Sequence, residues 1–446
     1  MRKIKLMTSF FRIIIWISPV LFCQKMLAQD VLSVEEAIEA ALKSNYDIET
    51  VRLDSTSYAI DYAYAKAAFL PALNGSASRV FNHNNQNQKL SDGSIKQRNG
   101  IKSNNLSASV NMNWTLFDGL RMFATREKLA EFQRLGEFSV KQQIVTTVAA
   151  VINNYYDVVR QKQQLKAIEE QISINDERVK LADKKFSVGL GAKPELLQAK
   201  VDLNAQRAAQ LTQQTLIAQL KEQLNQLIGF PITKSYEVSD SIPFNPQLQF
   251  GSIRNDVETT NPTLLVAKKN IDISRLTLKE YRADFFPTVS LNSAYNFSRT
   301  NNAEVINTFT PLFNQNKGLN YGLSVSVPIL NGFNTRRLVR QSKLDIRLQE
   351  VNYLNQLSKI DVGLNNAFKD YELYKKLLKL EEENIVLAKE NVNIALERFR
   401  LGISTNLELR EAQISLEQGY DRLIAARYNT KVAETELMRL QGDILK

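Results

Sequence analysis

The sequence predicts an α+β membrane protein built from a duplicated unit, in which alternating strands adjoin very long helices. Three observations indicate this fold class. Residues 185–203 and 398–416 align without a gap, four segments alternate polar with apolar residues, and the stretches 120–186 and 333–399 each contain one glycine and no proline. An internal duplication of this kind constrains the architecture before any single motif is interpreted.

The repeated motif reads KFSVGLGAKPELLQAKVDL at 185–203 and RFRLGISTNLELREAQISL at 398–416, an offset of 213 residues. The same offset relates the glycines that follow each motif, Gly229 and Gly442. Farther upstream the offset is 216 for a matched asparagine and a matched proline: Asn45 with Asn261, and Pro71 with Pro287. The three-residue slip predicts a loop downstream of these prolines, because insertions collect in loops.

These matches divide the chain into four segments: a signal peptide (1–28), a first repeat (29–229), an inter-repeat linker (230–260) and a second repeat (261–446). The first segment has the basic start, apolar core and terminal small residue of a secretory signal. Lipidation at Cys23 is the alternative, although the large Phe22 precedes it. Cleavage after Ala28 would lower the net charge from +10 to +5, because five basic and no acidic residues would be lost. So small a basic balance does not suggest nucleic acid.

The first repeat begins with a predicted helix. From Ser33 to Leu70 apolar and alanine residues recur at helical spacing, and we expect Ser33 to cap this helix and Pro71 to end it. Beyond it the period changes to two, which predicts two pairs of strands. Their ranges are Leu73 to Phe81, Leu106 to Phe117, Val289 to Phe297 and Leu319 to Val327. Long loops rich in Asn and Gln, 83–105 and 299–318, join the members of each pair.

Alternating strands joined by long polar loops at one end are typical of outer-membrane barrels. Two ordinary hairpins on a soluble core are the alternative. Four strands cannot close a barrel, since about eight are the minimum, and each unpaired edge group costs several kcal/mol in lipid. Several copies must therefore share one barrel. Two copies would give eight strands with a filled interior, and three would give twelve with room for water.

The long helices extend far beyond the size of a compact domain. At 1.5 Å per residue, each of the stretches 120–186 and 333–399 would span about 100 Å. Return helices are expected from Pro194 to Ile228 and from Asn406 to Gln441, after reversals that the glycines at 189, 191 and 402 suit. The chain's one histidine, His83, lies in an Asn-rich loop, which excludes a His-based triad or a multi-His metal site. We therefore expect no enzyme, cofactor or metal site.

Together these features resemble the TolC-like outer-membrane efflux protein (outer membrane factor) family over essentially the whole mature chain. The resemblance rests on the duplicated unit, the strand pairs, the long helices, the VGLGAKPELLQAKVDL and LGISTNLELREAQISL hairpins and the LxxLxG ends. It implies a homotrimer with a twelve-stranded barrel in the outer membrane and a tube of helices across the periplasm. It also implies the exit duct of a tripartite efflux or type I secretion system, with a periplasmic adaptor and an inner-membrane transporter of the RND or ABC type as partners.

The resemblance further assigns roles to residues at the hairpins. The tips would dock the adaptor, through Val188, Gly189, Leu190, Leu401, Gly402 and Ile403. Glu408 and Glu411, three apart and so on one helix face, match two acids that line the family's periplasmic constriction, and Glu195 is the retained acid of the first hairpin. A solvated helix face, or an ordinary ion pair with a neighbouring arginine, is the alternative for the two acids.

One departure concerns how the tip closes. In the family a tyrosine and an arginine of the second hairpin bond to the first hairpin, and here Phe399 and Ser404 occupy those positions. Arg398 and Arg400 are close enough in sequence to substitute. The competing function class is a secreted coiled-coil scaffold, which would explain the helices but leave the alternating strands without a purpose. The exported compound is not encoded in any recognisable motif.

Overall fold

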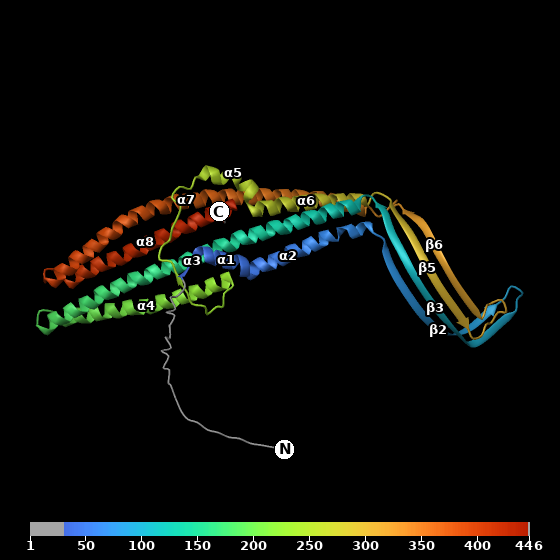
Figure 1. Ribbon diagram of the computed structural model, residues 1–446, viewed down its shortest axis with the longest axis horizontal. Helices are drawn as coiled ribbons and strands as arrows, with labels where there is room; N and C mark the ends of the chain where they lie inside the picture. Colours follow the sequence, from blue (N-terminus) through green and yellow to red (C-terminus); the bar gives the residue numbers. More distant parts are fainter. Residues whose placement is uncertain (1–30, 445–446) are drawn as a thin grey trace, which may run out of the picture.

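The computed structural model describes residues 31–444. The expected signal peptide and Cys23 lie outside the described residues. The chain is elongated, with a rod of long helices that ends in a four-stranded antiparallel sheet (Figure 1). None of the described helices combines the length and the apolar character needed to cross a membrane.

Two helices and a short turn replace the single helix expected over 33–70. They are α1 (Val34–Ser44), α2 (Tyr46–Ala63) and the 3-10 helix η1 (Ala65–Phe69). The break lies at Asn45, which is extended and whose side chain accepts hydrogen bonds from the amides of Asp47 and Ile48, each 3.0 Å. Asparagine favours such a cap over a helix interior. Ser33 caps α1 as predicted, in a capping box with Glu36.

The sheet contains the four predicted strands, in the order β2 (Ala72–Lys89), β3 (Ile95–Asp118), β5 (Thr288–Asn302) and β6 (Phe313–Ser326). The two repeats meet where β3 pairs with β5. The strands run farther than expected, because most of the predicted loop 83–105 continues the β2–β3 ladder. Asn and Gln side chains do not prevent that pairing, since the ladder joins backbone groups whatever the side chain.

The two faces of the sheet differ sharply in polarity. Side chains of one face are mainly apolar and include Leu73, Val110, Met112, Trp114, Leu291, Tyr295, Leu319, Leu323 and Val325. The opposite face carries hydroxyl and amide groups, which bond across strands from Ser76 to Ser109 (2.9 Å) and from Asn113 to Asn292 (2.7 Å). Such a sheet suits lipid on one side and water on the other.

Five further helices form the rod: α3 (Arg121–Ser187), α4 (Lys193–Ile228), α6 (Pro262–Ala283), α7 (Asn334–Arg400) and α8 (Asn406–Gln441). The long and return helices lie within one residue of their predicted bounds. Each long helix starts two residues after a glycine with positive φ, Gly119 or Gly332. At Gly119 a Cβ would lie 2.4 Å from the carbonyl oxygen of Ala283, so only glycine fits this turn.

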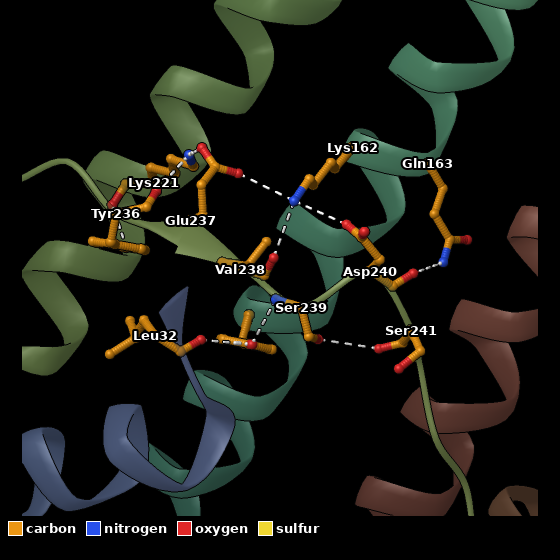
Figure 2. Close-up of polar contacts among 11 residues, drawn as sticks. Leu32, Lys162, Gln163, Lys221, Tyr236, Glu237, Val238, Ser239, Asp240 and Ser241 are labelled. Carbon is orange, nitrogen blue, oxygen red and sulfur yellow. Dashed lines mark hydrogen bonds and ion pairs between the residues drawn. The ribbon is translucent and has the colours of Figure 1, made fainter. Parts of the chain in front are cut away.

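The first part of the segment between the repeats packs on the first hairpin, and its last part packs on the helices of the second repeat. It holds β4 (Glu237–Val238), which pairs in parallel with β1 (Val31–Leu32), and α5 (Phe250–Thr260), a helix that its weak periodicity did not predict. Figure 2 shows the polar contacts around β4. Lys162 of α3 reaches Glu237 (3.1 Å) and Asp240 (2.9 Å), and Lys221 of α4 also reaches Glu237 (3.1 Å). Burial alone would lower the pKa of Lys162, but the hydrogen bonds to the two carboxylates outweigh it and raise the pKa.

The duplication is visible in matched hydrogen bonds. The side-chain amide of Asn45 donates to the carbonyl of Leu227 (2.9 Å), and that of Asn261 donates to the carbonyl of Leu440 (2.7 Å). Both asparagines also cap the helix that follows them. Each repeat therefore joins its first helix to the end of its return helix in the same way.

Candidate functional site: the hairpin tips and the acidic pair

Each hairpin tip is a tight reversal built around one glycine. In the first, Gly189 has φ +77°, and the amide of Leu190 donates to the carbonyl of Lys185 (2.8 Å). In the second, Gly402 has φ +74°, and the amide of Ile403 donates to the carbonyl of Arg398 (2.9 Å). These left-handed residues close the last helical turn and reverse the chain. No atom lies within 4 Å of a Cβ built on either glycine, so their backbone conformation, and not crowding, requires glycine.

The tips expose large apolar side chains at the far end of the rod from the sheet (Figure 1). Leu190 is 82% exposed and Leu401 73% exposed, and Val188 and Ile403 are each about two-thirds exposed. Four such residues on two neighbouring turns form a small apolar surface that this chain does not cover. Surfaces of this kind mark contacts with other proteins.

Glu408 and Glu411 lie on α8, next to the second tip, and share an open groove of about 460 Å³ with Arg398 of α7. Arg398 is 3.8 Å from Glu408. Glu411 has no side-chain partner in the described part of the chain. Glu195 lies in the first turn of α4, on the other hairpin, and no bond between described residues joins it to either acid. One chain therefore brings Glu408 and Glu411 together but does not add Glu195 to them.

The two hairpins contact each other close to the tips. Arg400 at the end of α7 forms an ion pair with Glu177 of α3. Lys185 of α3 donates to the carbonyl of Phe399 (2.9 Å), with its ammonium 3.8 Å from the centre of that ring. Arg400 therefore joins the two hairpins, as its place in the sequence allowed. Arg398 instead pairs with Glu408 within the second hairpin.

Phe399 and Ser404 themselves make different contacts from those of a tyrosine and an arginine lock. The Phe399 ring is buried and packs with Leu396 and Leu409. The Ser404 hydroxyl points back to the carbonyl of Ala395 within the second hairpin (3.5 Å). Neither side chain forms a hydrogen bond or an ion pair with the first hairpin in the described structure, although the Lys185 ammonium lies over the Phe399 ring. Next to the tips, the polar contacts between the hairpins come instead from Arg400 and Lys185.

A buried polar cluster farther from the tips also joins the hairpins, and sequence reasoning missed it. Arg178 of α3 donates to the side chain of Gln413 in α8 (2.7 Å) and forms an ion pair with Asp202 of α4. Gln413 also donates to Asn175 (3.3 Å), and Arg410 lies 3.6 Å from Asp202. The sequence offered one clue, because Arg178 lies on the same heptad-spaced face of its helix as apolar residues that pack between the hairpins. A single sequence does not distinguish such a buried face from a solvated one.

The family described as outer membrane efflux protein matches residues 37–230 and 253–443, which is most of the chain. The chain belongs to the outer membrane efflux protein family. It is 22% identical over 421 residues to the probable efflux pump outer membrane protein TtgC of Pseudomonas putida, covering 92% of this chain and 83% of that protein. It is 24% identical over 365 residues to the outer membrane protein TolC of Escherichia coli, covering 78% and 72%.

The fold agrees with that of a solved outer membrane channel. The crystal structure of the Campylobacter jejuni CmeC outer membrane channel superposes with a TM-score of 0.78 at 17% identity, over 92% of this chain and 86% of that one. The TolC-like resemblance and the α+β fold are thus confirmed. As a member of the outer membrane efflux protein family, the protein is a transport channel of the outer membrane whose helices extend into the periplasm.

Proposed function

We propose that three copies of the chain form the exit duct of a tripartite pump. The observation that carries this proposal is the open sheet. β2 and β6 are its outermost strands, and their free edges cannot remain unpaired in lipid. Three copies supply twelve strands, which leave an aqueous lumen lined by the hydroxyl and amide face, whereas two copies supply eight and leave a filled interior.

The test is the mass of the detergent-extracted protein by native mass spectrometry. A trimer is expected, and a stable monomer or dimer would overturn the proposal. A secreted coiled-coil scaffold remains soluble without detergent, so extraction behaviour separates that alternative. The free edges and the lipid-suited face of the sheet favour the barrel.

The adaptor and the inner-membrane transporter are also part of the proposal. The exposed apolar side chains at the two tips support docking of a periplasmic adaptor there, because the tips lie at the end of the rod farthest from the membrane sheet. Efflux of small compounds and type I secretion of proteins both use such a route. Co-purification with a crosslinked adaptor and transporter of the RND or ABC type distinguishes the two.

For Glu408, Glu411 and Glu195 we propose a place at the periplasmic constriction. The shared groove of the first two acids supports this for them, since a three-fold axis would repeat the pair around a narrow neck. The role of Glu195 follows from the family resemblance alone. Closure of that neck would be held by the contacts of Arg400 and Lys185 with the opposite hairpin.

A further inference from the structure

Four basic side chains, Arg79, Lys102, Arg299 and Lys317, lie on the apolar face of the four-stranded sheet. Arg79 is paired through Leu106 with Arg299 across three neighbouring strands, and Lys317 of β6 lies opposite Phe297. Lys102 of β3, which pairs with His83 on the side of Leu106 toward the β2–β3 turn, shares this face. The opposite face carries Lys96 and Arg98 only near the β2–β3 turn, beyond the pairing with β5. Over residues 72–82, 103–115, 288–302 and 314–326 it carries only Ser, Thr, Asn, Gly, Ala and Val side chains. Arg79, Lys102, Arg299 and Lys317 therefore do not line the aqueous side.

Their height on the sheet matches the thickness of a membrane. The apolar face begins near Val289 at the helix end of β5, and Arg299 lies ten residues along the same strand. At about 3.4 Å per residue and a strand tilt near 40°, this corresponds to about 26 Å, close to the apolar band of about 25 Å in outer-membrane barrels. Since the helices extend into the periplasm, the cations lie at the level of the outer-leaflet headgroups.

Among the described residues, none of the four cations has an acidic partner, and three of them form cation–π contacts with aromatic rings. Arg79 lies 4.8 Å from the ring centre of Phe81, Arg299 5.2 Å from that of Phe313, and Lys317 5.9 Å from that of Phe297. No carboxylate forms an ion pair with Arg79, Lys102, Arg299 or Lys317 within residues 31–444. All four are exposed in the chain. Their charge is thus uncompensated, and stacking limits the orientations of three of them.

We propose that Arg79, Lys102, Arg299 and Lys317 form a lipid-binding belt for the phosphate groups of glycolipids in the outer leaflet. Guanidinium groups bind phosphate oxygens through two parallel hydrogen bonds, and lysine adds a point charge. A phosphate would supply the anion that the sheet lacks. The lipid acyl chains would then cover the apolar strands directly below, which are the part of the molecule that must be in lipid.

The test measures lipid binding by the mature protein in phosphatidylcholine nanodiscs that contain a fixed fraction of bisphosphorylated lipid A. Native mass spectrometry counts the lipid A molecules that stay bound to the protein. The variant Arg79→Gln/Arg299→Gln/Lys317→Gln should bind this lipid at least about tenfold more weakly, since each basic residue near a membrane surface contributes about 1 kcal/mol. The control Lys89→Gln/Lys343→Gln/Lys376→Gln removes the same charge at exposed positions away from the belt and should bind as the wild type does.

Two further arms make the result specific. The variant Arg79→Lys/Arg299→Lys/Lys317→Arg keeps the charge and should retain binding, which separates loss of phosphate contacts from misfolding. Dephosphorylated lipid A and phosphatidylglycerol should both bind the wild type more weakly. Equal binding by the wild type and the glutamine variant would contradict the lipid-binding belt. The cations would then only contact water. Equal binding of phosphatidylglycerol would overturn the assignment to phosphorylated glycolipids.

Discussion

Arg178 in the first hairpin donates a 2.7 Å hydrogen bond to Gln413 in the second, and its side chain is only 1% exposed. The two residues are 235 positions apart in the chain. Asp202 balances the arginine charge from the return helix of the first hairpin. The hairpins are thus joined by a buried anchor here and by the more exposed contacts of Arg400 and Lys185 near the tips.

The two charged residues of the buried anchor, Arg178 and Asp202, should contribute unequally to the free energy of unfolding. Asp202→Asn leaves the Arg178 guanidinium buried without its counter-charge, which typically costs about 3–5 kcal/mol. Arg178→Met should cost less, because Asp202 is partly exposed and also lies near Arg410. Loss of helical circular dichroism on heating measures both. Asp176→Asn, which removes an exposed pair with Lys180 on the same helix, is the control and should change little. Equal losses in the Asp202 and Asp176 variants would contradict the buried anchor.

The tip surface should determine adaptor binding. Leu190→Ser and Ile403→Ser remove exposed apolar area without altering the glycines, and each should weaken adaptor crosslinking and export while the trimer remains intact. Leu197→Ser, also exposed but one turn along α4, is the matched control. Substituting Gly189 or Gly402 is a less clean test, since a positive φ strains any other residue. Normal export by both tip variants would place docking elsewhere.

The acidic pair should make the channel selective for cations. A ring of like charges in a narrow neck favours counter-ions and binds multivalent ones. In planar bilayers, Glu408→Gln/Glu411→Gln should shift the reversal potential toward that of a non-selective channel. The same variant should relieve block by multivalent cations added on the periplasmic side. Glu383→Gln/Glu390→Gln removes two exposed acids of α7 and serves as the charge-matched control. If the reversal potential and the block both stay unchanged in the first variant, these carboxylates do not line the constriction.

The Arg400 contact should hold the tip closed. Glu177→Gln and Arg400→Gln each remove the same ion pair, so each should raise the open fraction in single-channel recordings, and the double variant should do no more than either one. Lys180→Gln breaks an ion pair within α3 and should leave the open fraction unchanged. Additive effects of the two single variants would show that the pair does not act as one lock.

The linker contacts should weaken in acid. Burial would raise the pKa of Glu237, but its hydrogen bonds to Lys162 and Lys221 outweigh that effect and hold the pKa below its usual 4.5. A carboxylate with a lowered pKa stabilises the fold above its usual pKa, and that contribution is lost as the pH falls through the lowered value. Protection of the β4 amides from hydrogen exchange, corrected for the intrinsic exchange rate at each pH, should therefore fall below about pH 4.5. In Lys162→Met this acid-dependent step should be smaller, and an unchanged step would contradict the assignment.

Local signals were sufficient to find the strands, the long helices and the return helices, but not α5. Proline and glycine positions and the change of period from 3.6 to two located the strands and long helices, because they act through the backbone of neighbouring residues. Matched residues such as Asn45 and Asn261 revealed the duplication. The break at Asn45 itself was missed, since helical spacing continues across it and the competing cap depends on one side chain. The length of β2 and β3 was also missed, because pairing with a neighbour and not side-chain type decides it.

The sequence by itself determined the fold class, the bounds of the long and return helices, the hairpin tips and the family. Only the tertiary structure decided which residues join the hairpins and which face of the sheet holds the basic side chains. Periodicity identifies the face of one helix, but it does not specify which other helix meets that face or at what height. The contacts Arg178 with Gln413, Arg400 with Glu177 and Lys185 with Phe399 all depend on that relative placement.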